Sequence, residues 1–196
     1  ATVDIFVGQA KYTLTDLNDG NYSNPGKPTF GSQCNLMVKL PDGKYFSART
    51  NIPSKSETEV LFQDDNHSYA VSIKDNPVEK NFYWIFAQEG DYHFEYMKAP
   101  VIYYKTNLDL FTNSTIGDKF NRSEESNLFP GFTFIHKLGL RISDELLNGK
   151  TIQLEIKISD RGNRVERIQI VSADEYLDRY LKTSILQTDQ KAAGDN

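Results

Sequence analysis

The segment from Asn81 to Tyr104 constrains the fold more than any other, because it is dense in aromatic residues and holds the only tryptophan of the chain. Successive residues of a strand point to opposite faces. The two faces of Phe82–Ala87 carry, in order, Phe82, Trp84 and Phe86, and Tyr83, Ile85 and Ala87. Both sets are apolar, and a strand that is apolar on both sides needs cover on both sides. We therefore predict that Phe82–Ala87 is a central strand of the core.

The rest of this segment predicts two further strands. Gln88–Asp91 has the composition of a turn, and Tyr92–Met97 then alternates between aromatic and polar residues, as a half-exposed return strand does. After the break at Pro100, Val101–Tyr104 is rich in residues that favour strands. We expect a hairpin followed by a third strand.

Short segments of the same period-two character recur along the chain, separated by turn residues at intervals of about 8–12 residues. The other predicted strands are Val3–Val7, Ala10–Thr15, Cys34–Leu40, Tyr45–Thr50, Thr58–Gln63, His67–Ile73, Leu108–Phe111, Phe132–Ile142, and a hairpin from Ile152 to Val171. We predict a mainly β fold, an antiparallel β-sandwich or barrel of about ten strands with one C-terminal amphipathic helix.

The C-terminal helix is predicted from its start signal and from its spacing. Ser172 and Glu175 fit the S-x-x-E capping box, and Leu177, Leu181 and Ile185 recur at helical intervals, with Tyr176 and Tyr180 beside them. The residues after 187 have nothing to bury. We expect a single β-rich domain over residues 1–187, including a helix at 173–187, and a flexible tail at 188–196.

Two long polar segments, Asp16–Gly31 and Thr112–Asn127, interrupt the strands. Connections in compact domains are mostly shorter than about 12 residues, and longer ones are often functional. We expect both segments to be surface loops available to partners.

Composition limits the class of protein. The net charge of −5 is spread along the chain, which argues against a broad basic surface for nucleic acid. No apolar run approaches the roughly 18 residues that span a bilayer, so no membrane span is predicted. Cys34 is the single cysteine and cannot form an intrachain disulfide, which favours the cytoplasm or a virion over secretion. A chain that begins at Ala1 fits both loss of an initiator methionine and cleavage of a signal peptide.

The sequence predicts no catalytic residue, metal ligand or cofactor. It contains neither a nucleophile elbow nor a glycine-rich nucleotide loop, and its three histidines, His67, His93 and His136, are not at ligand spacing. His136 alternates with apolar residues, so we predict a hydrogen-bonded core histidine rather than a general base or a ligand. Cys34 is predicted to be an inert core thiol.

Three functional hypotheses follow. The first is a non-catalytic structural or interaction module, such as a virion or surface-assembly component, that presents its long loops and C-terminal tail to protein partners or to other copies of itself. The second is an OB-like binder of single-stranded nucleic acid, which the acidic charge disfavours. The third is an extracytoplasmic β-sandwich that binds carbohydrate or protein, in which four Asn-x-Ser/Thr sequons, at Asn21, Asn66, Asn113 and Asn121, would be used.

Two groups of residues are candidates for binding. The return strand of the aromatic hairpin presents a mixed face, and a hairpin near the C-terminus carries arginines. Aromatic rings of the first group could stack on bases or sugars, and the guanidinium groups of the second could hold phosphates. The candidate binding residues are Tyr92, His93, Glu95, Tyr96, Arg161, Arg164 and Arg167.

Overall fold

The computed structural model describes the chain except residues 19, 25, 27, 65–67, 94–100, 125–130, 144, 146, 148, 159–164, 195 and 196. At 64, 90–93, 101–107, 165, 166 and 189–194 it describes the backbone alone. The described residues form two compact units, Ala1–Lys55 (unit 1) and Ser56–Asn196 (unit 2). The single β-rich domain over residues 1–187 stays a prediction. Strands of unit 1 pair only with strands of unit 1 among the described residues, and the same holds for unit 2.

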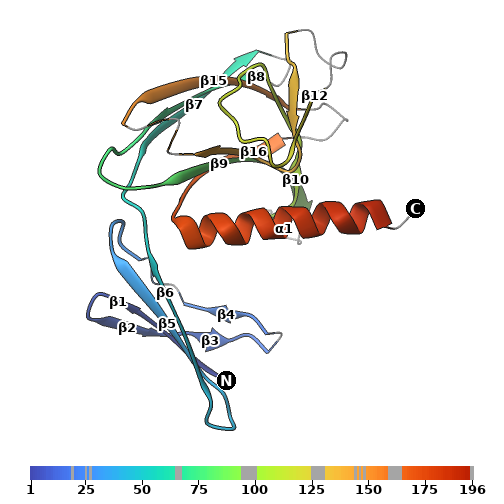
Figure 1. Cartoon of the computed structure of the whole chain (residues 1–196). Coiled ribbons are helices and arrows are strands. Elements are labelled where there is room, and N and C mark those ends of the chain that lie inside the picture. The colour runs from blue at the N-terminus through green and yellow to red at the C-terminus, as the bar shows by residue number, and fades with distance from the viewer. Residues whose placement is uncertain are drawn as a thin grey trace. The chain divides into compact units, whose positions relative to one another are not determined.

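Unit 1 is built on a four-stranded antiparallel sheet with the strand order β2-β1-β5-β6, and a two-stranded ribbon, β3-β4, lies between β2 and β5 in the sequence (Figure 1). Its strands are β1 (Thr2–Val7), β2 (Ala10–Thr13), β3 (Thr15–Asp16), β4 (Tyr22–Ser23), β5 (Gln33–Lys39) and β6 (Tyr45–Asn51). The predicted pairing of Cys34–Leu40 with Tyr45–Thr50 is confirmed. The predicted loop Asp16–Gly31 contains β4 and the end of β3.

The register of the unit 1 sheet gathers apolar residues on one face. Val3 lies opposite Val38, Ile5 opposite Leu36, and Val7 opposite Cys34. Residues that face each other across antiparallel strands share a side of the sheet. The apolar face of unit 1 therefore runs across β1 and β5, as the alternation predicts.

Unit 2 contains a sandwich of two sheets, sheet C with the order β12-β13-β11-β15-β8-β7, and sheet D with β10, β14 and β16 all paired to β9. Its strands are β7 (Glu57–Asp64), β8 (Ser68–Lys74), β9 (Phe82–His93), β10 (Val101–Leu108), β11 (Leu110–Thr112), β12 (Arg122–Glu124), β13 (Phe134–His136), β14 (Leu140–Ser143), β15 (Thr151–Ile158) and β16 (Val165–Ala173). The pairings among the described residues are antiparallel and leave both sheets open, so the sandwich alternative of the prediction is confirmed.

Strand β9 runs straight through the predicted turn at Gln88–Asp91, so that prediction was wrong. Gly90 pairs with Tyr104 and Asp91 with Tyr103 of β10, and this ladder holds the backbone extended. Polar residues are compatible with a strand when a neighbouring strand satisfies their backbone groups. The predicted return strand Tyr92–Met97 is therefore also wrong in its first two residues, which extend β9, and its remaining residues lie outside those described.

The predicted single strand Phe132–Ile142 is instead two strands that belong to different sheets. β13 pairs with β11 in sheet C, and β14 pairs with β9 in sheet D. The chain crosses between the sheets at Leu138 and Gly139, whose φ angles are 60° and 154°. Positive φ angles interrupt the hydrogen-bond ladder of a strand. The alternation of apolar residues in the sequence nevertheless continues from β13 to β14, because both strands face the same core.

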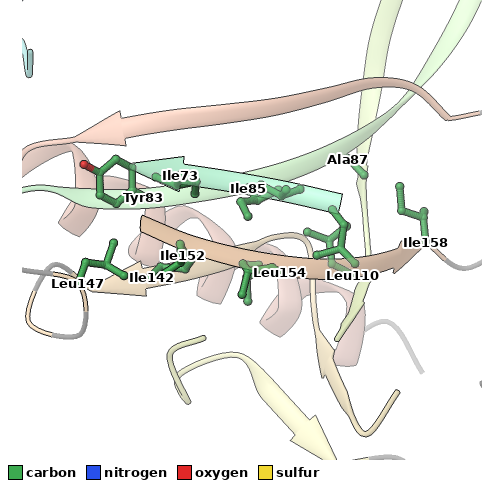
Figure 2. Close-up of a cluster of buried hydrophobic side chains, with 13 residues drawn as sticks. Ile73, Tyr83, Ile85, Ala87, Leu110, Ile142, Leu147, Ile152, Leu154 and Ile158 are labelled. Atoms are coloured by element: carbon green, nitrogen blue, oxygen red, sulfur yellow. The ribbon is translucent and has the colours of Figure 1, made fainter. Parts of the chain in front are cut away.

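The main core lies between the two sheets (Figure 2). Sheet D contributes Tyr83, Ile85 and Ala87 from β9, and sheet C contributes the alternate residues of β15 and β8. Tyr83, Ile85 and Ala87 have no exposed surface. The core thus uses one of the two apolar faces predicted for Phe82–Ala87.

Helix α1 (Glu175–Gly194) covers the second face (Figure 1). Phe82, Trp84 and Phe86 form a smaller cluster with Ile185 of the helix. The prediction of a central strand with cover on both sides is confirmed.

The start and end of α1 differ from the prediction. Asp174, not Ser172, caps the helix, since its Oδ1 accepts a hydrogen bond from the Leu177 amide at 2.8 Å. Ser172 is still paired in β16, opposite Tyr83. The helix continues to Gly194 rather than ending at 187, because residues 188–194 are mostly good helix formers and extending an existing helix needs no new nucleus.

Candidate functional site

The predicted binding residues lie along one side of sheet D or outside the described residues. Tyr92 and His93 end β9, where they pair with Ile102 and Val101 of β10. Arg167 is exposed on β16 and pairs with Gln88 of β9. Tyr92 is four residues further along β9 than Gln88. Glu95, Tyr96, Arg161 and Arg164 lie outside the described residues. The structure thus places three of the seven candidates on neighbouring strands and leaves the shared binding surface a prediction.

The most concentrated set of charged groups in the described part of unit 2 is buried and holds α1 on sheet D. Arg141 of β14 donates from Nε and Nη2 to the carboxylate of Asp178 on α1, at 2.6 and 2.9 Å. The Trp84 indole donates to the same carboxylate at 3.0 Å, and Arg141 also pairs with Asp118. Arg141 and Asp178 are each 4% exposed. Because this carboxylate is buried and already accepts three hydrogen bonds, we assign the network to the packing of the helix.

His136 is buried as predicted, but the predicted hydrogen bonds are missing among the described residues. Neither ring nitrogen has a partner there, and the side chain has no exposed surface. Burial and the positive charge of Arg122 lower the pKa of His136 to about 4, against the opposing effect of Asp118. The imidazole is therefore neutral at physiological pH, and it is packed against Gly117.

The second predicted loop, Thr112–Asn127, is held in place over its described part. Asn121 donates from Nδ2 to the carbonyl oxygens of Lys137 and Gly139, at 2.6 and 2.8 Å. β12 lies within this segment and pairs with β13. The described portion is thus part of the scaffold rather than a free binding loop.

β7 is an outermost strand of sheet C and has an unusual surface. Among the described residues it pairs with β8 alone. Three consecutive apolar residues of β7 are exposed, Val60 at 37%, Leu61 at 54% and Phe62 at 58%. Edge strands normally carry charge, proline or a bulge that discourages pairing with other chains. β7 has acidic residues at its ends and a register shift after Phe62, but its centre is apolar.

The start of β7 contacts sheet D. At its start, Ser56 Oγ lies 3.1 Å from Ser172 Oγ of β16 and 3.2 Å from the Tyr83 hydroxyl of β9, so the edges of the two sheets meet there. Further along, Val60 and Phe62 share the core side of β7, since their partners Val71 and Tyr69 belong to the core.

The strand of sheet D that carries Ser172 is β16, whose described neighbour is β9. Ile168 and Ile170 lie on the core side of β16 and are only partly buried. We call Val60, Phe62, Ile168 and Ile170 the open seam. Its residues are apolar on both strands, and neither β7 nor β16 has a described partner strand at its outer edge.

Sequence reasoning assigned Thr58–Gln63 to a hairpin but gave its exposed apolar residues no role. The available signal was the run Val60-Leu61-Phe62, in which neighbouring residues are apolar and must therefore occupy both faces. Such a run indicates either a strand covered on both sides or a strand with an uncovered apolar face, and only the structure distinguishes the two.

Other kinds of site find no support among the described residues. No group of three or more His, Cys, Asp or Glu side chains there could hold a metal ion. None of the described helices has the length and apolar character needed to cross a membrane.

Comparison with known proteins gives one result. No curated protein and no solved structure matches the chain. The family described as "Domain of unknown function (DUF4249)" matches residues 1–193, and the chain therefore belongs to this family.

Proposed function

We propose that the protein is a non-catalytic interaction module that accepts an extended segment of a protein partner along the edge of β7. The observation that carries the proposal is the exposed apolar run at the centre of this outermost strand. This is the class of function predicted from the sequence, but the partner would contact a strand edge and not the loops and the tail.

The backbone of β7 supplies the first part of the interaction. A strand with no neighbour on one side presents unpaired N–H and C=O groups along that side. An extended peptide that adds to such an edge completes these hydrogen bonds and gains affinity without regard to its sequence. The seven-residue stretch of β7 from Glu57 to Gln63 is exposed throughout, so it is long enough to pair with a peptide of similar length.

The side chains supply specificity. Alternate residues of an added strand would face the open seam and cover Val60 and Phe62. The other set would lie beside Glu57, Glu59 and Leu61 on the outer face. We therefore expect the partner segment to alternate apolar residues with polar or basic ones.

Selection from a library of random peptides displayed on phage tests this without knowing the natural partner. The immobilised full chain should enrich peptides with the alternating pattern, and a synthetic peptide of the enriched sequence should bind in fluorescence anisotropy. Phe62→Lys should weaken that binding at least tenfold. Val78→Lys, which changes another exposed apolar residue at 87% exposure, should leave it unchanged.

Two results would contradict the proposal. One is a selection that enriches no alternating peptide while circular dichroism shows a folded chain. The other is a peptide that binds wild type and Phe62→Lys equally, because the contact would then lie away from β7. Light scattering could show that the wild-type chain is a dimer and that the Phe62→Lys variant is a monomer. The partner would then be a second copy of the chain.

The other two hypotheses, binding of single-stranded nucleic acid and of carbohydrate, stay predictions. Of the arginines proposed to hold phosphates, Arg167 is described, and it is exposed beside β9. Fluorescence anisotropy with labelled oligonucleotides at two salt concentrations tests the first, since phosphate binding must weaken steeply with salt. A glycan array tests the second.

A further inference from the structure

Unit 1 contains a hollow of about 320 Å³ on the apolar face of its sheet. The four-stranded sheet contributes Ile5, Val7, Tyr12 and Cys34 to its lining, and the segments that lead into and form the β3-β4 ribbon contribute Leu14 and Tyr22. Ligand sites in proteins have volumes of roughly 300–1,000 Å³. The hollow therefore has the size of a site for a small molecule.

The lining is held in place by the chain itself. Asn24 donates from Nδ2 to the carbonyl oxygen of Thr13 at 3.1 Å, and its Oδ1 accepts from the Gly26 amide at 2.7 Å. Gly26 lies so close to the Tyr12 ring that a Cβ added to it would be 2.9 Å from a ring carbon. The amide of Asn24 is thus used to fix the segment over the sheet, and glycine at 26 permits the close approach. The hollow exists without a ligand to shape it.

The hollow also occupies a position that a core would normally fill. Val3 is the only buried hydrophobic residue among the described residues of unit 1. Ile5, Val7 and Cys34 are half-buried, although they lie on the apolar face. Apolar surface that remains open to water is a source of binding free energy for any apolar group that covers it.

The lining determines the class of ligand. None of the described residues that line the hollow carries a charge, and most of the side chains are aliphatic or aromatic. A charged group placed against these residues would lose hydration without gaining an oppositely charged partner among them. Two tyrosines, Tyr12 and Tyr22, provide rings for stacking. We propose that the hollow in unit 1 is a binding site for a small neutral molecule with an aromatic ring, a role independent of strand pairing at β7.

The single cysteine makes this testable, because any thiol label on the chain reports on the hollow. The rate of Cys34 alkylation by iodoacetamide is measured by intact mass while indole is added to the full chain. Burial raises the pKa of the Cys34 thiol, so the reaction is run above neutral pH and at the same pH in every sample. Indole should slow alkylation at least fivefold with a saturable dependence on its concentration. Indole-3-acetate, which adds a negative charge to the same ring, should slow it less than twofold.

Variants separate the hollow from other contacts. Ile5→Trp and Val7→Phe each fill the hollow and should abolish protection by indole. Two such variants are used so that the test still holds if one of them misfolds. Met37→Ala alters the opposite face of the same sheet and should retain full protection. The proposal is overturned if indole leaves alkylation of the folded wild-type chain unchanged. It is equally overturned if indole-3-acetate protects as well as indole, or if protection persists in both filled variants.

Discussion

Unit 1 and unit 2 follow the same binary pattern of alternating apolar residues, yet they differ in what covers their apolar faces. In unit 2, β9 has sheet C on one side and α1 on the other, and its residues from Phe82 to Ala87 are all buried. In unit 1, the central strands β1 and β5 together bury a single hydrophobic residue, Val3. Alternation thus determines which residues share a face, whereas burial depends on a second layer that the pattern of one strand does not specify.

The second layer of unit 2 is fixed by polar contacts as well as by apolar packing. Asp178 on α1 is bonded to Arg141 and to the Trp84 indole, so the helix cannot shift without leaving a buried charge unpaired. The described residues of unit 1 contain no helix and no ion pair as deeply buried. The two units should therefore respond very differently to the loss of a side chain.

The largest effect is expected at Trp84, which packs between Phe86 and Phe120 with ring centroids 5.7 and 5.5 Å away. Trp84→Ala should lower the free energy of unfolding by about 3–5 kcal/mol, because it leaves a cavity and removes one of the hydrogen bonds to the buried Asp178 carboxylate. Circular dichroism in a denaturant titration measures this, since the variant lacks the only tryptophan fluorophore.

Trp84→Phe is the control for this prediction. It keeps a ring in the cluster but removes the indole N–H, so its cost should be clearly smaller than that of Trp84→Ala. A Trp84→Ala variant within 1 kcal/mol of wild type, on the scale usual for surface substitutions, would show that α1 does not cover this face.

A smaller effect is expected at His136, whose native pKa of about 4 lies below the ordinary 6.5. As pH falls from 6.5 toward 4, the unfolded chain binds a proton that the native chain does not. The stability contributed by the neutral imidazole is therefore complete above pH 6.5 and is lost progressively down to pH 4. The difference between the two pKa values corresponds to about 3 kcal/mol. Denaturant titrations at several pH values in this window measure the loss.

His136→Leu separates this contribution from that of other titrating groups. The variant keeps an apolar side chain beside Gly117 and has no imidazole to protonate. Its stability should fall by about 3 kcal/mol less than that of wild type over the same window. Parallel curves for the two proteins would mean that His136 is solvated in the native state.

The sequence predicts the elements of both units better than it predicts their connections. The hairpins β5-β6 and β7-β8 and the two-faced strand at Phe82–Ala87 follow from alternation and turn residues alone. The continuity of β9 through Gly90 does not, because it depends on β10 as a partner. Leu138 likewise occupies a backbone conformation that its residue type disfavours, and only tertiary contacts such as the Asp109 carboxylate on its amide explain it.

The candidate site was harder to predict than the fold. The binding surface was predicted from arginines and tyrosines, because these side chains have a distinctive chemistry. Among the predicted binding residues, Arg167 is the only one whose side chain the structure describes. The exposed run at Val60–Phe62 and the hollow beside Cys34 consist of ordinary core residues. Such residues become conspicuous only where a covering layer is missing, and that depends on the packing of distant segments.

The smallest effect is expected at Leu36 of unit 1, and comparing it with the same substitution at Leu154 of unit 2 distinguishes the two units most directly. Leu154 of β15 is 4% exposed in the main core of unit 2, whereas Leu36 of β5 is half-buried on the apolar face of unit 1. Leu154→Ala should cost about 2–5 kcal/mol, and Leu36→Ala less than about 1 kcal/mol. Hydrogen exchange measured on peptides from each unit reports the free energy of opening of that unit alone. Equal costs would mean that Leu36 is covered as fully as Leu154, and the apolar face of unit 1 would then have no open surface to offer a ligand.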